Sequence, residues 1–144
     1  MSPIIRTASA RRTDMRAEAD AAGVNEAFID ALVETFYARV REDDLLGPVF
    51  AHAIGADWAG HLATMKQFWQ SVALGSGAYS GRPIPAHHKH VDRMGPEHFT
   101  RWLSLFERTL EDISENDDAR AFFMVRAERI GARFQDILFS DRHN

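Results

Sequence analysis

Three histidines within four residues are the part of this sequence with the clearest chemical potential. His87, His88 and His90 lie between a Gly/Pro-rich turn and an amphipathic stretch that carries Trp102. Neutral imidazole is the commonest protein ligand for transition metals, so the cluster predicts a metal ligand. The chain has no cysteine, which excludes disulfides, iron–sulfur clusters and thiolate zinc sites. The groups that face the metal must therefore come from other segments.

The composition is that of an ordinary single domain. A chain of 144 residues with a net charge of -4 can bury a sizeable core. This charge gives no reason to expect a nucleic acid or a membrane as partner. No apolar run approaches the ~18 residues of a spanning helix, and the first residues lack the apolar core of a signal peptide. We therefore expect a cytoplasmic protein.

Apolar residues recur at helical spacing in four long segments, and no segment alternates as a strand would. Asn25 and Asp57 can cap helices that run to about residues 42 and 74. Pro96 suits the first position of a third helix. A fourth helix follows a polar break at residues 114–118. The pattern predicts an all-α fold.

Two stretches are expected to be irregular. Leu46-Gly47-Pro48 predicts the end of the first helical region, followed by a short apolar connector. Residues 1–24 have almost no large apolar side chains after Ile5, which predicts a mobile extension or a frayed helix. The folded domain is therefore expected at residues 25–144.

Three neutral hydrogen-bonding side chains fall on the apolar faces of separate predicted helices. They are Tyr37, His61 and Trp102. A zinc hydrolase would need about three protein ligands and a carboxylate base, and these faces supply no Asp or Glu. They supply apolar side chains instead, namely Phe50, Met65, Phe68 and Phe99. A haem suits such a lining, because it is a large apolar disc whose iron needs one protein nitrogen.

The sequence resembles the truncated haemoglobins, specifically the third group of that family. The resemblance covers roughly residues 27–139, and four stretches carry it: FYARVREDDLLGPVF (36–50), AIGADWAGHLATMKQFW (53–69), YSGRPIPAH (79–87) and HFTRWLSLFE (98–107). It implies a shortened globin, in which two helix pairs form a two-over-two sandwich around haem b (iron protoporphyrin IX).

The resemblance also implies a role for each candidate residue. His87 becomes the proximal ligand of the iron, and Tyr37, His61 and Trp102 become distal residues that contact a bound diatomic. The haem-packing positions fall on Phe50, Met65 and Phe99, with Phe68 beside them.

The proximal ligand has one alternative register. Its spacing from Pro83 favours His87, whereas an apolar residue three positions after the ligand would favour His88, with Val91. Family members with a longer spacing between the ligand and the HF motif follow the first register, so we assign the ligand to His87.

Three functions remain open at this point. The leading one is a haem protein that binds oxygen, carbon monoxide or nitric oxide at an iron with five ligands or a weakly held sixth. A redox enzyme with peroxidase-like or nitric oxide dioxygenase activity is the second, because donors that stabilise bound oxygen also help to cleave an O–O bond. The third is a non-haem metal-binding module built on His87, His88 and His90. A reductase partner is compatible with the first two.

Overall fold

The computed structural model describes residues 8–75 and 94–139, and every regular element in these ranges is a helix. Six helices follow one another within these ranges: α1 (Ala8–Ala21), α2 (Glu26–Glu42), α3 (Leu46–Ile54), α4 (Trp58–Leu74), α6 (Pro96–Ile113) and α7 (Asp117–Phe139). Among these helices, none is both long and apolar enough to cross a bilayer. The all-α prediction is confirmed.

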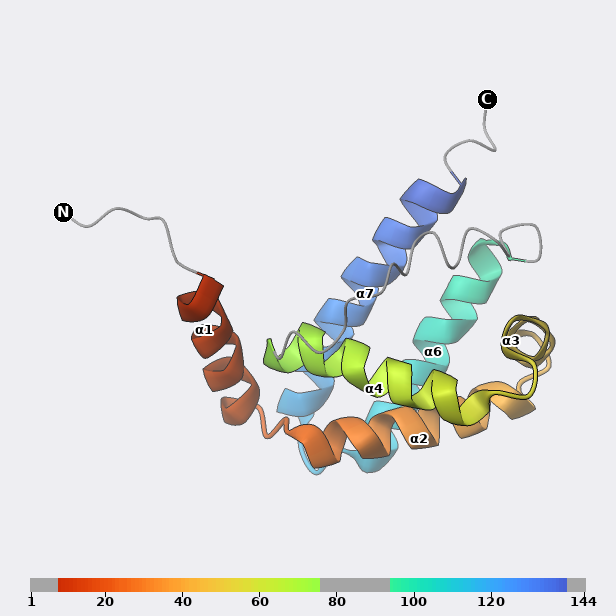
Figure 1. The fold of residues 1–144 in the computed structure, drawn as a ribbon. Coiled ribbons are helices and arrows are strands. Elements are labelled where there is room, and N and C mark those ends of the chain that lie inside the picture. Colours follow the sequence, from red (N-terminus) through yellow and green to blue (C-terminus); the bar gives the residue numbers. More distant parts are fainter. Residues whose placement is uncertain (1–7, 76–93, 140–144) are drawn as a thin grey trace.

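The helices form two antiparallel pairs (Figure 1). In Figure 1, α2 and α4 run side by side across the molecule. Helices α6 and α7 form the second pair, which crosses the first pair at a steep angle. The pairs meet because α2 contacts α6, and α3 contacts both of these helices. This arrangement confirms the predicted two-over-two sandwich.

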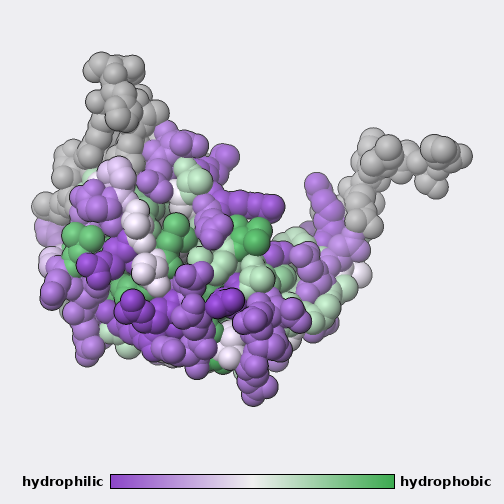
Figure 2. All heavy atoms as spheres, turned by 180° about the vertical axis from the view of Figure 1, so that it is seen from behind, coloured by the Kyte–Doolittle hydropathy of each residue, from purple (hydrophilic) through white to green (hydrophobic). Residues whose placement is uncertain are grey.

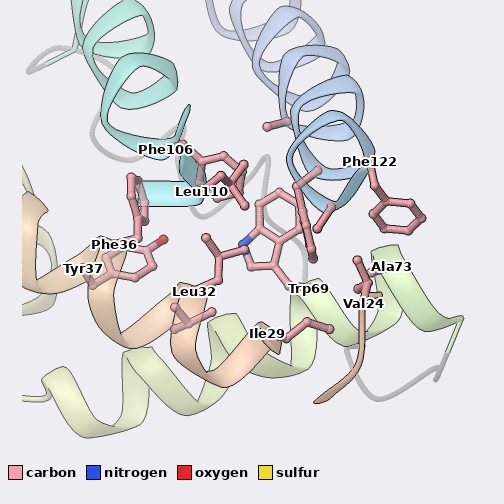
Figure 3. Close-up of a cluster of buried hydrophobic side chains, with 14 of the residues drawn as sticks. Val24, Ile29, Leu32, Phe36, Tyr37, Trp69, Ala73, Phe106, Leu110 and Phe122 are labelled. Carbon is pink, nitrogen blue, oxygen red and sulfur yellow. The ribbon is translucent and has the colours of Figure 1, made fainter. Parts of the chain in front are cut away.

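An aromatic core joins the two pairs around Trp69 of α4 (Figure 3). Its side chain is 2% exposed, and its ring centroid lies 5.1 Å from that of Phe106 and 5.8 Å from that of Phe123. Such ring pairs contribute roughly 0.5–1.5 kcal/mol each beyond the burial of their area. Phe106 belongs to α6 and Phe123 to α7, so this cluster fixes α4 against the second pair.

The helix ends follow the predicted capping signals. Asn25 Oδ1 accepts a hydrogen bond from the Phe28 N–H at 2.9 Å, and Asp57 Oδ1 accepts one from the Gly60 N–H at 3.1 Å. Each bond satisfies one of the backbone donors that a first turn leaves without a helical partner. Pro96 occupies the first turn of α6 as predicted. These local signals place α4 and α6, which carry most of the candidate site.

The expected connector after Pro48 is a helix, α3, and this part of the prediction was wrong. Pro48 lies in its first turn, where a missing N–H costs no helical hydrogen bond. The Asp43 carboxylate accepts bonds from the N–H groups of Leu45 at 3.1 Å and Leu46 at 2.9 Å, which caps the new helix. Proline therefore starts a helix here instead of ending one.

Helix α1 packs against α4 at the N-terminal side of the molecule (Figure 1). Ala19 is fully buried, and Glu18 lies 3.4 Å from Arg126 of α7. In Figure 2 this arm carries hydrophilic side chains with weakly hydrophobic ones between them, whereas the strongly hydrophobic residues lie on the body. Residues 8–21 are thus helical, and the mobility expected of the extension stays a prediction.

Candidate functional site

A cavity of about 230 Å³ lies where the two helix pairs meet, with walls from α2, α3, α4, α6 and α7. Most of the described lining residues are apolar, and none of them is Asp, Glu, Lys or Arg. The polar side chains in the described lining are neutral hydroxyl, imidazole and indole groups. The cavity is therefore suited to a large apolar ligand that meets a few hydrogen-bond donors.

Seven of the predicted site residues line this one cavity. They come from four helices: Tyr37, Phe50, His61, Met65, Phe68, Phe99 and Trp102. The eighth, His87, lies outside the described residues, as do the alternative ligand His88 and the neighbouring His90. The structure thus brings the distal set together, and the proximal ligand stays a prediction.

Tyr37 places its phenol at the cavity from the buried face of α2. It follows Phe36 in the row of α2 side chains shown in Figure 3, and its side chain is 4% exposed. The centroids of the two rings lie 4.9 Å apart at an interplanar angle of 72°. Burial raises the pKa of the Tyr37 phenol well above its usual value, because the phenolate would lose its hydration. The group therefore stays a neutral donor at physiological pH.

His61 lies among aromatic rings at the first turn of α4. Its ring centroid is 4.8 Å from that of Tyr37, at 89°, and 6.3 Å from that of Phe50, at 68°. The Nε2 atom is buried, and the residue lines the cavity. Edge-to-face packing of this kind favours one orientation of a ring over others. The imidazole is therefore held close to the phenol that we expect to act with it.

Trp102 brings an indole to the cavity from α6. Its ring stacks on Phe106 with centroids 5.1 Å apart and an interplanar angle of 13°. It also meets the edge of Phe36 at 5.7 Å and 89°. Phe36 thus contacts both Trp102 and Tyr37, so one buried ring supports two of the candidate donors.

His98 also lines the cavity, and it was not assigned to the site from the sequence. Its Nδ1 accepts a hydrogen bond from the Gly95 N–H at 2.9 Å, which closes the first turn of α6. The neutral imidazole then carries its proton on Nε2. The position of His98 three residues after Gly95 is the signal that could have revealed this capping role.

Several other lining residues were predicted only as core or left without a role. They are Leu46, Val49, Thr64, Met94, Ile130, Gly131 and Phe134. Ile130 and Phe134 lie four residues apart on α7, so the helical period alone places them on one face. That this face meets a cavity depends on how α7 crosses the other helices, which no local pattern records.

The lining fits a haem better than a bare metal ion. A porphyrin needs apolar walls and one nitrogen ligand, and the described walls are apolar with neutral donors. The described residues contain no group of three or more His, Cys, Asp or Glu side chains that could hold a metal ion. The clustered histidines are not part of that set, because they lie outside the described ranges.

Comparisons with known proteins agree with this geometry. Residues 19–134 match the family described as "Bacterial-like globin". A group 3 truncated hemoglobin of Campylobacter jejuni is 38% identical over 121 residues, which cover 81% of this chain and 92% of that protein. The crystal structure of a group III truncated hemoglobin from Campylobacter jejuni has a TM-score of 0.72 and 38% identity, covering 80% of this chain and 91% of that one. This chain therefore belongs to the bacterial-like globin family, as a homologue of the group III truncated haemoglobins.

Proposed function

We propose that this protein binds haem b and uses it to hold oxygen or another diatomic ligand reversibly. Membership of the family implies haem as the cofactor and a diatomic ligand as the partner. The proposal assigns roles to five main residues: His87 as the proximal ligand, Tyr37, His61 and Trp102 as distal donors, and Phe50 against the porphyrin.

The observation that carries the proposal is the convergence of three neutral donors on one apolar cavity. Tyr37, His61 and Trp102 come from three helices far apart in the sequence, and all three line it. Haem supplies a ferrous iron that can take a small gas on its free face. Donors aimed at a ligand there would stabilise it, and each hydrogen bond is worth about 1 to 2 kcal/mol net. A cavity with no donors would retain such a ligand less well.

We assign the apolar walls of the cavity to the porphyrin. Phe50, Met65, Phe68 and Phe99 supply them in the described structure. Phe99 is 8% exposed, and its ring centroid lies 6.5 Å from that of Phe134. Aromatic and thioether side chains suit a flat conjugated ligand, because they offer dispersion contact without polar atoms to desolvate.

We assign His61 a second capacity, as a weak sixth ligand of the ferric iron when no gas is present. Its imidazole lines the cavity, and neutral imidazole is a competent axial ligand. The ferric protein should then show a low-spin component that His61→Ala removes. A ferric spectrum that stays high-spin from mildly acid to neutral pH, unchanged by the substitution, would contradict this role.

We place the protein in the cytoplasm, where an electron donor such as a reductase keeps the iron ferrous. The motivation is chemical, because reversible oxygen binding needs ferrous iron. Cell fractionation tests the location. Reduction of the purified ferric protein by a cytoplasmic extract with NADH tests the partner, and no reduction above the rate of NADH alone would contradict it.

The absorption spectrum of the purified protein tests the proposal directly. We expect a strong Soret band in the natural protein, and a five-coordinate ferrous spectrum that His87→Ala loses and added imidazole partly restores. His88→Ala is the matched control, because it removes the adjacent imidazole and should leave the spectrum unchanged. Loss in His88→Ala alone would move the proximal ligand by one residue. No Soret band after haem reconstitution would favour the non-haem metal module instead.

A further inference from the structure

Trp58 has no role in the function proposed above, although it packs directly on a candidate distal residue. It is the first residue of α4, three positions before His61. The Trp58 ring centroid lies 5.7 Å from that of His61, at an interplanar angle of 87°, and 6.5 Å from that of Tyr37. An indole held edge-on against an imidazole limits the orientations that the imidazole can take.

Arg41 covers this indole from α2. Its guanidinium carbon lies 4.6 Å from the centroid of the Trp58 ring, within the range of a cation–π contact. Arg41 follows Tyr37 by four residues, so the two side chains share one face of α2, one turn apart. Tyr37 contacts His61 and Arg41 contacts Trp58, as expected where α4 runs antiparallel to α2. His61 and Trp58, which lie one turn apart on α4, are thus each contacted by a side chain of α2.

Exposure orders these four residues from the core to the surface. Tyr37 is buried, His61 and Trp58 are half-buried, and Arg41 is exposed. His61 lines the cavity, whereas the described lining does not include Trp58 or Arg41. Because Trp58 packs against His61, the indole limits how far the imidazole can move in its direction.

We propose that Trp58, held by Arg41, is a positioning residue that keeps His61 turned into the cavity and so limits the rate at which a diatomic ligand enters. The inference rests on the proposed function, because that function makes His61 a distal residue. When the indole moves aside, the imidazole gains room to turn toward solvent, and the path into the cavity opens.

The association rate of carbon monoxide after flash photolysis of the haem-loaded ferrous protein measures this opening. Trp58→Ala should bind about ten-fold faster, because it loses ring contacts with His61 and Tyr37. Trp58→Phe keeps a ring there and should stay near the natural rate. Arg41→Gln should bind about two- to five-fold faster through loss of an exposed cation–π contact. Arg120→Gln is the matched control, since it removes the same charge at an ion pair with Glu111 and should change nothing.

A second readout follows His61 itself. Its reaction with diethyl pyrocarbonate, measured by peptide mass spectrometry on the same protein, should accelerate in Trp58→Ala and Arg41→Gln and not in Arg120→Gln. If Trp58 acts through His61, adding Arg41→Gln to His61→Ala should leave the association rate unchanged from that of His61→Ala.

The outcomes separate the two proposals. Suppose that Trp58→Ala and Arg41→Gln both bind gas and both react at His61 at the rates of the natural protein. This result would overturn the role of Trp58, and it would leave the proposal of haem binding intact. If Trp58→Ala fails to fold, Arg41→Gln decides alone, because the Arg41 side chain is exposed and its loss spares the core. A natural protein that takes up no haem would overturn the proposed function, and the modification rates would still test the hold of Trp58 on His61.

Discussion

At the scale of single residues, the candidate site depends on a few rings that hold polar groups in place. Phe36 is 1% exposed and packs edge-on against both Tyr37 and Trp102, which belong to different helices. Because one buried ring supports two donors, a shift of either donor is transmitted to the other. Their effects on a bound ligand should therefore be coupled instead of independent.

Removal of single donors should speed the release of oxygen more than that of carbon monoxide. Tyr37→Phe and Trp102→Phe each lose a hydrogen bond worth about 1 to 2 kcal/mol, which predicts about ten-fold faster oxygen release. Carbon monoxide carries less charge when bound, so its release should change much less. Stopped-flow release rates for both gases measure this. Equal acceleration for the two gases would show a steric effect and contradict the hydrogen-bond account.

The buried phenol of Tyr37 should also make the fold sensitive to alkali. Burial raises its pKa in the folded state, while the unfolded phenol ionises near pH 10. The contribution of the Tyr37 phenol to the free energy of unfolding is therefore complete below about pH 10, and it is lost as the pH rises above that value. Urea unfolding at pH 9 and pH 11 should show a larger drop in the free energy of unfolding for the natural protein than for Tyr37→Phe. Equal drops would mean that Tyr37 does not carry this sensitivity.

The sequence predicted the candidate donors but only part of the cavity wall. Tyr37 and His61 could be found because each lies on an apolar helix face at regular spacing. Thr64 and Phe134 could not, because they line the cavity only where α4 and α7 cross the other helices. A crossing geometry is set by the packing of complete helix surfaces, and no short motif encodes it.

At the scale of helices, the ends of α2, α4 and α6 were predictable because each depends on one or two residues. Asn25, Asp57 and the Gly95–Pro96 pair act within a single turn. The extent of α1 was not predictable, since its sequence has no apolar stripe and the buried residue described in it is the small Ala19. Packing instead of propensity stabilises most short helices, so this one could not be read from its composition.

The glycine that ends α4 provides a test of the contact between α1 and α4. Gly75 lies in the left-handed helical region, with a φ of 66° and a ψ of 30°. A methyl group on Gly75 would lie 3.1–3.3 Å from atoms of Arg12 in α1. Gly75→Ala should therefore cost more than the strain of about 1 to 2 kcal/mol that a left-handed residue alone carries.

Denaturant unfolding of Gly75→Ala in the full chain and in a chain that lacks residues 2–18 measures this cost, because the backbone strain is common to the two. The excess loss of stability in the full chain reports the approach of α1 to the end of α4. Equal losses in the two chains would show that Arg12 moves away without cost. Such a result would mean that α1 is held loosely at this point.

At the scale of the whole molecule, the cavity lies between two helix pairs that are joined both through the core and through α3. Trp69 stacks on Phe106 at an interplanar angle of 26° and joins the pairs through the core, while it also lines the cavity. On the second side, α3 lies against both α2 and α6. An ion pair between Asp43 and Arg101, at 3.3 Å, links the turn before α3 to α6. Most of the described lining thus comes from helices that are packed against one another.

Removal of residues 2–18 should weaken this assembly without removing the site. Helix α1 packs on α4, and its Glu18 pairs with Arg126, whose guanidinium carbon lies 3.6 Å from the centroid of the Phe122 ring. A half-exposed ion pair contributes little, so most of the effect should come from packing. We expect a loss of about 1 to 3 kcal/mol in the free energy of unfolding.

Haem binding should survive this truncation, because the family match begins at residue 19 and the described cavity wall begins at Tyr37. Thermal unfolding and the Soret band of the truncated protein measure the two effects separately. Glu18→Gln serves as the matched control and should change the free energy of unfolding by less than about 0.5 kcal/mol. An unchanged stability after truncation would mean that residues 2–18 form the mobile arm expected from composition. A lost Soret band would instead make α1 a support of the cofactor site, because its contact with Gly75 lies directly before the segment that carries His87.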